Sequence, residues 1–231
     1  MPDCKVSSRP MRRGSRQEDA VNRSWIRVAS LAVAAALIVP SLTGQAKLTV
    51  AELTAAKSIG SRQAPITLEV FSDYQCPDCK RLHSATTQQV IDNYVSSGKV
   101  YLVHRDFPLS MHPYSRQAAR WLNAAAAAGL FQSTENALYA KQEEWGATGN
   151  IEQALASVLP AADMRKVRVM ESSQRAQLDA AVQADVNLGN SRNVSGTPSI
   201  FVTHRGQMTP LPAGSVSYTL LKQYLDYLLQ R

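Results

Sequence analysis

The chain has 231 residues, 45% of them hydrophobic, which is enough for one or two domains with a buried core. Its formal net charge is +7, but residues 1–27 hold seven basic against three acidic side chains, and the remaining charge forms no basic stripe. A nucleic-acid partner is therefore not expected. Only two of the three cysteines lie beyond the basic leader, which excludes a small scaffold stapled by disulfides.

The N-terminal stretch predicts an export signal. A basic segment that ends at Arg27 is followed by an apolar run over residues 28–40, and small residues near Ala46 suit cleavage after that position. An uncleaved membrane anchor is the alternative, although the apolar run is shorter than the roughly 20 residues that span a bilayer and Pro40 interrupts it. Both interpretations place the cysteines of the body outside the cytoplasm.

The chain then predicts two strands separated by a helix. A polar lead-in over residues 47–64 holds one short helix or strand and closes before a proline that favours an extended chain. Residues 66–71 are apolar on both faces apart from two positions, as a central strand should be. A helix is expected to run to about Tyr94, and residues 100–106 form the second strand.

The first strand leads into Cys76-Pro77-Asp78-Cys79, and the helix follows it. This order places the first thiol where unpaired backbone N–H groups and the positive end of the helix dipole converge. That position favours Cys76 as the thiolate, which is the nucleophilic form. Cys79 lies almost one helical turn further on, so the two sulfurs can join in a disulfide or separate as a dithiol. The motif therefore predicts a site of thiol–disulfide exchange.

A block of short helices is expected next, followed by two strands and a closing helix. Trp121 and Trp145 are expected in the core of the block. The later strands are predicted at residues 199–203 and, more weakly, 207–209. This order predicts an α/β fold with a central mixed sheet flanked by helices. The predicted helices are 115–128, 135–145 ended by Gly146, 151–158 begun by a capping box of Asn150 and Gln153, one through Leu178 and Val182 ended by Gly189, and 217–230.

Three stretches of the sequence together resemble the DsbA-like branch of the thioredoxin superfamily. They are residues 69–79 with the two cysteines, residues 105–109 before the helical block, and Gly196-Thr197-Pro198-Ser199 at the start of a later strand. The resemblance covers about residues 58–230 and implies a thioredoxin fold with an inserted all-helical subdomain. The implied parts are a signal or anchor (1–46), a lead-in (47–64), the first part of the thioredoxin domain (65–111), the helical insertion (112–192) and the second part of the domain (193–231).

The resemblance also assigns roles to individual residues. Cys76 would be the attacking cysteine that forms a mixed disulfide, and Cys79 the resolving one. Thr197 and Pro198 would form a cis-proline pair that faces the disulfide, since a cis peptide bond is accessible chiefly before proline. The backbone of Thr197 would then be free to pair with an extended substrate peptide.

The residues between the cysteines depart from the family's usual pattern. Its oxidants commonly have histidine where Asp78 stands, and a carboxylate raises the pKa of a nearby thiol whereas an imidazolium lowers it. Asp78 is therefore expected to make the couple less oxidising, and Pro77 beside it is a further residue expected to tune the site. Threonine before the cis-proline resembles the isomerase and reductase branches as much as the oxidase, but residues 47–64 are too few for the isomerases' dimerisation domain.

Several titratable residues have both a functional and a structural interpretation. Glu69 is a candidate buried proton acceptor that would tune Cys79, and its alternative is a solvated acid facing the edge. We expect His83 on a solvated helix face rather than at the thiols. His104 and His112 have no motif spacing and are interpreted as structural.

A copper- or zinc-binding chaperone is the alternative from a different class, with both cysteines and a histidine as ligands. The sequence has no second Cys or His pair at finger-like spacing, and Gly-Thr-Pro-Ser has no role in that interpretation. We therefore expect no metal and no cofactor.

The sequence thus predicts a monomeric protein thiol–disulfide oxidoreductase, periplasmic or secreted. An oxidase is preferred, and a reductase or isomerase of the same fold is the alternative. The expected partners are cysteine-containing proteins and a membrane redox partner, either a quinone-linked reoxidant or an electron donor.

Overall fold

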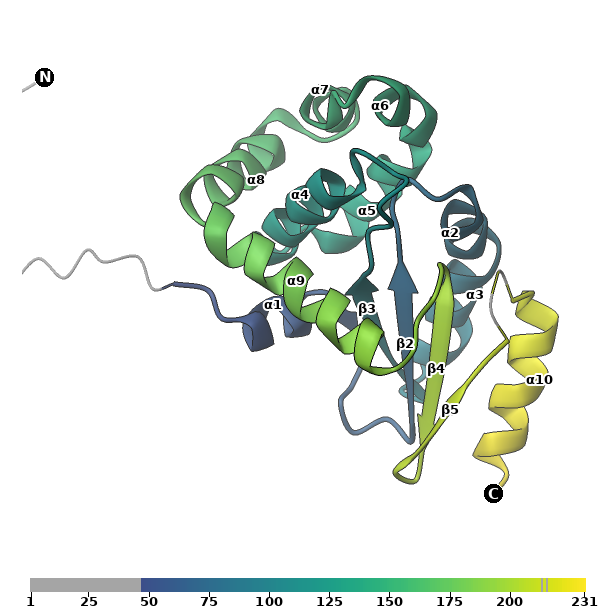
Figure 1. The fold of residues 1–231 in the computed structure, drawn as a ribbon. Helices are drawn as coiled ribbons and strands as arrows, with labels where there is room; N and C mark the ends of the chain where they lie inside the picture. The colour runs from purple at the N-terminus through teal and green to yellow at the C-terminus, as the bar shows by residue number, and fades with distance from the viewer. Residues whose placement is uncertain (1–46, 213, 215) are drawn as a thin grey trace, which may run out of the picture. The chain divides into compact units, whose positions relative to one another are not determined.

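A five-stranded mixed sheet is the centre of the computed structural model, which describes residues 47–212, 214 and 216–231 (Figure 1). The strand order is β1-β3-β2-β4-β5, with β2 and β3 parallel and the other neighbours antiparallel. Central β2 is rich in β-branched and aromatic residues and is buried along almost its whole length. The strands are β1 (Ser58–Ile59), β2 (Ile66–Ser72), β3 (Val100–Asp106), β4 (Ser199–His204) and β5 (Gln207–Pro210).

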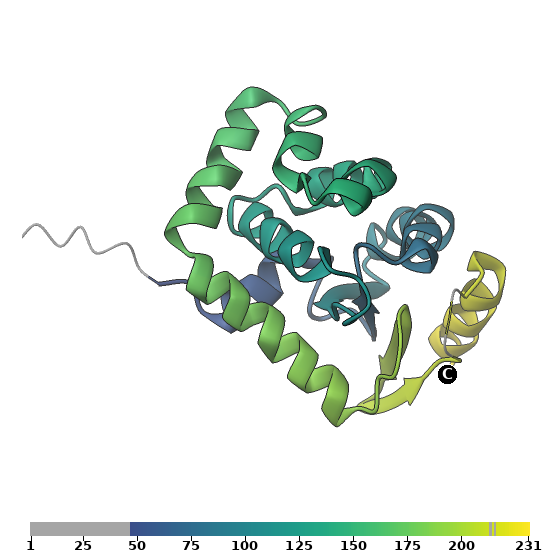
Figure 2. The same cartoon turned by 45° about the horizontal axis from the view of Figure 1, so that its top comes forward.

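Helices cover both faces of this sheet (Figures 1 and 2). Alternate residues of β2 point to opposite faces: Leu68 and Val70 pack under α10 (Tyr218–Leu229), whereas Phe71 packs with Phe107 and Phe201 on the other face. The first face is also covered by one helical run from residue 77 to residue 95. This run comprises α2 (Pro77–Leu82), the π-helical segment η1 (His83–Thr87), α3 (Gln88–Val90) and a second π segment, η2 (Ile91–Val95).

A block of helices is inserted between β3 and β4, so the predicted architecture of a mixed sheet with a helical insertion is confirmed. Both tryptophans lie in its core, as expected; the side chain of Trp145 is fully buried and its Nε1 donates to the carbonyl of Leu138 at 2.7 Å. The inserted helices are α4 (Ser115–Ala127), α5 (Phe131–Ala140), α6 (Gln142–Thr148), α7 (Ile151–Ala156), α8 (Ala161–Ser173) and α9 (Arg175–Ser191).

Four details of the helical block differ from the prediction. The helix expected over residues 135–145 is two helices, α5 and α6, because the chain leaves helical geometry at Lys141. Gly146 lies inside α6, which ends at Gly149, where the left-handed backbone (φ 75°) favours glycine. The side chain of Asn150 makes no capping hydrogen bond to α7, and helix α8 was not predicted separately.

The short lead-in also adopts regular structure. Helix α1 (Val50–Ala56) begins with a capping box between Thr49 and Glu52, and β1 follows it at the edge of the sheet. No helix in the described part of the chain is both long enough and apolar enough to cross a membrane. The predicted export signal or anchor, residues 1–46, lies outside the described residues.

Gly189 of α9 provides a test of the packing against the sheet. A Cβ atom there would lie 2.6 Å from Cε2 of Phe107 and 3.2 Å from Cε1 of Phe71. Alanine normally stabilises a helix by about 1 kcal/mol relative to glycine, but overpacking a core costs about 1–3 kcal/mol. We therefore expect Gly189→Ala to lower the free energy of unfolding in urea titrations. Asn190→Ala, on the exposed side of the same helix, is the control, and a stabilised Gly189→Ala protein would contradict this packing.

Candidate active site

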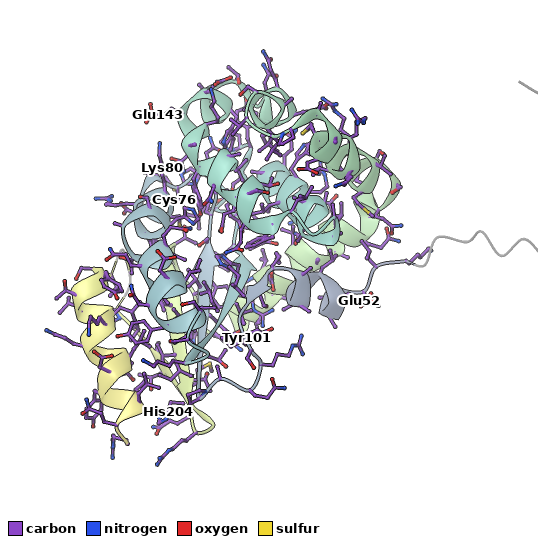
Figure 3. All side chains as sticks on the ribbon, turned by 180° about the vertical axis from the view of Figure 1, so that it is seen from behind. Glu52, Cys76, Lys80, Tyr101, Glu143 and His204 are labelled. Atoms are coloured by element: carbon purple, nitrogen blue, oxygen red, sulfur yellow. The ribbon has the colours of Figure 1, made fainter. Side chains whose placement is uncertain are left out.

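The two cysteines lie at the junction of β2 and α2. Cys76 is the N-cap residue of α2, with extended backbone (φ −73°, ψ 126°), and Cys79 lies within its first turn. Cys79 is almost completely buried at 1% exposure, whereas Cys76 retains 7%. Figure 3 shows Cys76 near Lys80, at the end of the molecule away from His204. Both thiols are free in this structure, so it represents the reduced pair.

Thr197 and Pro198 lie against the first cysteine, and the peptide bond between them is cis. The sulfur of Cys76 donates to the carbonyl oxygen of Thr197 at 3.5 Å. The loop that bears these residues leads directly into β4, which pairs with β2. The structure therefore brings together the four residues that the resemblance assigned to catalysis, from two segments about 120 residues apart.

The two thiols have opposite acidities. A hydrogen bond from the Cys79 thiol lowers the pKa of Cys76 to about 6, with help from the backbone N–H of Cys79 and the Thr197 side chain; burial and the nearby Asp73 carboxylate oppose this shift. Burial raises the pKa of Cys79, and the hydrogen bond to Cys76 and its negative charge raise it further. At neutral pH the pair therefore consists of an outer thiolate and an inner thiol, which suits nucleophilic attack by Cys76.

Asp73 holds the turn that precedes the motif. Its carboxylate is fully buried and accepts four hydrogen bonds from three parts of the chain. The donors are the backbone N–H of Gln75 at 2.7 Å, the hydroxyl of Ser115 at 2.5 Å, the backbone N–H of Leu109 at 2.8 Å and Nδ1 of His112 at 2.8 Å. The interpretation of His112 as a structural residue agrees with this contact.

The residues between the cysteines contribute to the helix rather than to the sulfur. Pro77 occupies the first helical position, where its missing N–H costs nothing. Asp78 is about half exposed and forms an ion pair with Arg81. The largest contributions to the Cys76 pKa come from other groups, so a tuning effect of Asp78 stays a prediction.

Glu69 is buried in β2, and both of its carboxylate oxygens accept hydrogen bonds from arginines. One carboxylate oxygen accepts from Nε and Nη2 of Arg105 at 3.0 and 2.8 Å, and the other accepts from Nη1 of Arg192 at 2.7 Å. The solvated alternative is therefore wrong. These contacts also leave the predicted exchange of a proton with Cys79 without support, because neither oxygen bonds to that sulfur.

The expectation for His83 was also wrong, since this histidine is buried beneath α5. Its Nε2 lies 2.8 Å from Oδ1 of Asn136, and its ring packs on Tyr139 with centroids 4.8 Å apart. His104 is buried nearby, with Nδ1 3.1 Å from Glu135, in keeping with a structural role. Within residues 47–231, as far as the structure describes them, no group of three or more His, Cys, Asp or Glu side chains could hold a metal ion.

Two glutamines that sequence reasoning missed connect the motif to the insertion. The side-chain amide of Gln142 donates to the carbonyls of Tyr74 and Cys76 at 2.8 and 2.9 Å. Gln75 donates to the carbonyl of Gly146 at 3.0 Å and accepts from the backbone N–H of Tyr114, also at 3.0 Å. Gln75 adjoins the motif, but no sequence pattern marks Gln142, which lies 66 residues after Cys76.

A family model described as Thioredoxin matches residues 53–225, three quarters of the chain. The chain belongs to the thioredoxin family. Its fold is similar to that of oxidised BdbD from Bacillus subtilis, with a TM-score of 0.61 at 21% identity over 76% of this chain and 93% of that one. It is also similar to alpha-DsbA1 from Wolbachia pipientis, with a TM-score of 0.59 at 17% identity over 75% of this chain and 90% of that one. These likenesses confirm the predicted thioredoxin fold of the DsbA-like form.

Curated relatives match in sequence over part of their length. The "Na(+)/H(+) antiporter NhaA 3" of Salinispora tropica is 30% identical over 166 residues, which are 71% of this chain and 24% of the antiporter. The "Probable disulfide bond formation protein D" of Bacillus anthracis is 24% identical over 157 residues, which are 63% of this chain and 69% of that protein. The chain thus spans about a quarter of the length of the antiporters that it matches.

The acidity of Cys76 gives a direct test of the site. With a pKa of about 6, its rate of alkylation by iodoacetamide should rise as pH passes through 6 and level off by about pH 8, because the thiolate reacts. Cys79→Ala leaves Cys76 as the single thiol of the site but removes its hydrogen-bond donor, so the midpoint should move upward. An unaltered protein whose midpoint lies between pH 8 and 9, as for an ordinary thiol, would contradict this geometry.

Proposed function

We propose that this protein is an exported thiol–disulfide oxidoreductase that exchanges disulfides with cysteine-containing proteins through Cys76 and Cys79. The observation that carries the proposal is the asymmetry of the pair. Cys76 lies at a helix N-terminus with a lowered pKa and keeps 7% exposure, whereas Cys79, at 1% exposure, is the thiol that donates a hydrogen bond to it. An exchange centre needs one accessible nucleophile and one protected thiol that resolves the intermediate.

The exchange runs through a mixed disulfide. In the oxidising direction a substrate thiolate attacks Cys76 of the Cys76–Cys79 disulfide, the S–S bond breaks, and Cys79 leaves as a thiolate that takes up a proton. A second substrate thiolate then attacks the substrate sulfur and releases Cys76 as a thiolate. The substrate loses two electrons as its disulfide forms, and the cysteine pair gains them.

The acidity of Cys76 favours oxidation over reduction. A thiolate that its surroundings stabilise makes the reduced pair more stable and is also the better leaving group, so the disulfide passes more readily to a substrate. A pKa of about 6 for Cys76 therefore supports a protein disulfide oxidase, despite the carboxylate of Asp78. A reductase or isomerase with the same residues is the second candidate, and the threonine before the cis-proline is as compatible with it as with an oxidase.

Thr197 is proposed to orient the substrate. Its carbonyl lies 3.5 Å from the reactive sulfur, and Pro198 directly precedes the first residue of β4. An extended peptide that pairs with the backbone of Thr197 would bring its own cysteine to Cys76. The proposed recycling partner is a membrane redox protein, which this protein would meet outside the cytoplasm. The partner would be a quinone-linked reoxidant for an oxidase and an electron donor for a reductase.

Serine variants test the assigned roles. Cys76→Ser should abolish exchange with a disulfide peptide or with insulin, because no nucleophile remains at the accessible position. Cys79→Ser should accumulate substrate proteins in mixed disulfides at Cys76, visible as species that a reductant releases. Ser72→Ala, which removes a hydroxyl but no thiol, is the control. Full activity of Cys76→Ser, or trapping through Cys79 instead, would refute the assignment.

The reduction potential decides the direction of catalysis. Purified residues 47–231 would be equilibrated in glutathione buffers, and the fraction of Cys76–Cys79 disulfide measured. We expect a value toward the DsbA end, about −120 mV, as for an oxidase, whereas one near that of thioredoxin, about −270 mV, would establish a reductase. If no reversible disulfide forms, the oxidoreductase proposal fails.

A further inference from the structure

Helix α6 of the insertion touches the motif segment at three points. Gln142, its first residue, donates to the carbonyls of Tyr74 and Cys76. One turn later, the carbonyl of Gly146 accepts from the side chain of Gln75. At the surface between these points, Glu143 lies 3.5 Å from Lys80 of α2, and Figure 3 shows these two residues on the same side as Cys76.

The hydrogen bonds from Gln142 to the motif are buried. Its side chain is 6% exposed, and its single Nε2 spans two carbonyls of the turn between β2 and α2. The Cys76 carbonyl also accepts the first helical bond, from the N–H of Lys80 at 3.2 Å. A buried carbonyl that loses its donor costs about 1–3 kcal/mol, so the amide stabilises this turn chiefly through the carbonyl of Tyr74, because that of Cys76 keeps the N–H of Lys80.

The amide itself is held rigidly. The helix break at Lys141 begins α6 directly opposite the motif. Three residues after Gln142, Trp145 is fully buried, and its indole N–H donates to the carbonyl of Leu138 in α5. The position of Nε2 is therefore set by the core of the insertion rather than by a mobile surface side chain. Two hydrogen bonds to the same motif from such a support fix the backbone direction at Cys76.

We infer that Gln142 is a positioning residue that fixes the reactive sulfur of Cys76 and couples the helical insertion to the redox pair. The thiolate of Cys76 is stabilised by the thiol and the backbone N–H of Cys79, and both hydrogen bonds depend on small distances. A turn released from Gln142 lets the sulfur move away from both. The inference deepens the proposed function, since it states which part of the insertion controls the exchange site.

The test compares Gln142→Met with Gln174→Met. Methionine keeps the length and shape of glutamine but has no N–H to donate, and Gln174, between α8 and α9, is buried to the same 6% away from the motif. We expect Gln142→Met to raise the alkylation midpoint of Cys76 by about one pH unit, which is about tenfold less thiolate below pH 6. Exchange with a disulfide peptide at that pH should slow about threefold, because the less acidic thiolate is also the stronger nucleophile, while Gln174→Met leaves both quantities unchanged.

A merely structural role would lower the melting temperature of Gln142→Met without moving the midpoint of Cys76, and that result in a folded protein would overturn the inference. The midpoint is measured without any substrate. An unaltered protein that lacks exchange activity would therefore refute the proposed function while the effect of Gln142 could still be observed.

A second measurement serves if Gln142→Met does not fold. In the unaltered, reduced protein, the NMR signals of the Gln142 side-chain amide should be slow to exchange with solvent and should shift with a midpoint near pH 6 as Cys76 ionises. The side-chain amide of Gln174 is the internal control and should not shift in that range. Side-chain amide signals of Gln142 that do not shift as Cys76 ionises would also overturn the inference.

Discussion

The buried carboxylate of Asp73 is the contact on which the geometry of the site depends. It joins the turn before the motif to the loop after β3 and to the start of α4, through four hydrogen bonds. A buried charge is stable only when such donors surround it, so these three segments are fixed together or not at all. The same charge raises the pKa of Cys76, and the Cys79 thiol, the Cys79 N–H and Thr197 outweigh it. The carboxylate that fixes these three segments therefore also makes the Cys76 thiol less acidic than it would be without that charge.

Behind the site, buried ion pairs join the insertion to the sheet in addition to the apolar packing of α9. Lys57, after α1, pairs with Asp106 of β3 and with Asp185 of α9, and Arg105 bridges Asp185 and Glu69. Removing one partner of a buried pair typically costs about 3–5 kcal/mol, because a charge is left without compensation. Helices α1 and α9 are therefore held in one arrangement on β3. Together with the hydrogen bonds of Gln75 and Gln142 at the motif, these ion pairs hold the insertion in a fixed position against the sheet.

Some local errors in the sequence interpretation share one physical origin. His83 was expected on a solvated helix face, but α5, about 50 residues later, covers that face of the helix. Glu69 was considered as a proton acceptor because it lies in a central strand close to the motif. Its actual partners, Arg105 and Arg192, come from the neighbouring strand and from the loop after α9. Local patterns indicate which side chains are available, but they do not indicate which distant element packs against them.

The sequence by itself determined the strands around the motif, the position of Cys76 at a helix N-terminus and, through Gly196-Thr197-Pro198-Ser199, the segment that faces it. These features follow from short-range preferences: β-branched runs for strands, proline at the first helical position and a Cys-x-x-Cys spacing of nearly one turn. Only the tertiary structure decided which groups lower the pKa of Cys76, how strongly burial raises that of Cys79, and the parts played by Asp73, Glu69 and Gln142. Those depend on burial and on hydrogen bonds between residues up to about 120 positions apart, and such contacts form only when the insertion closes over the sheet.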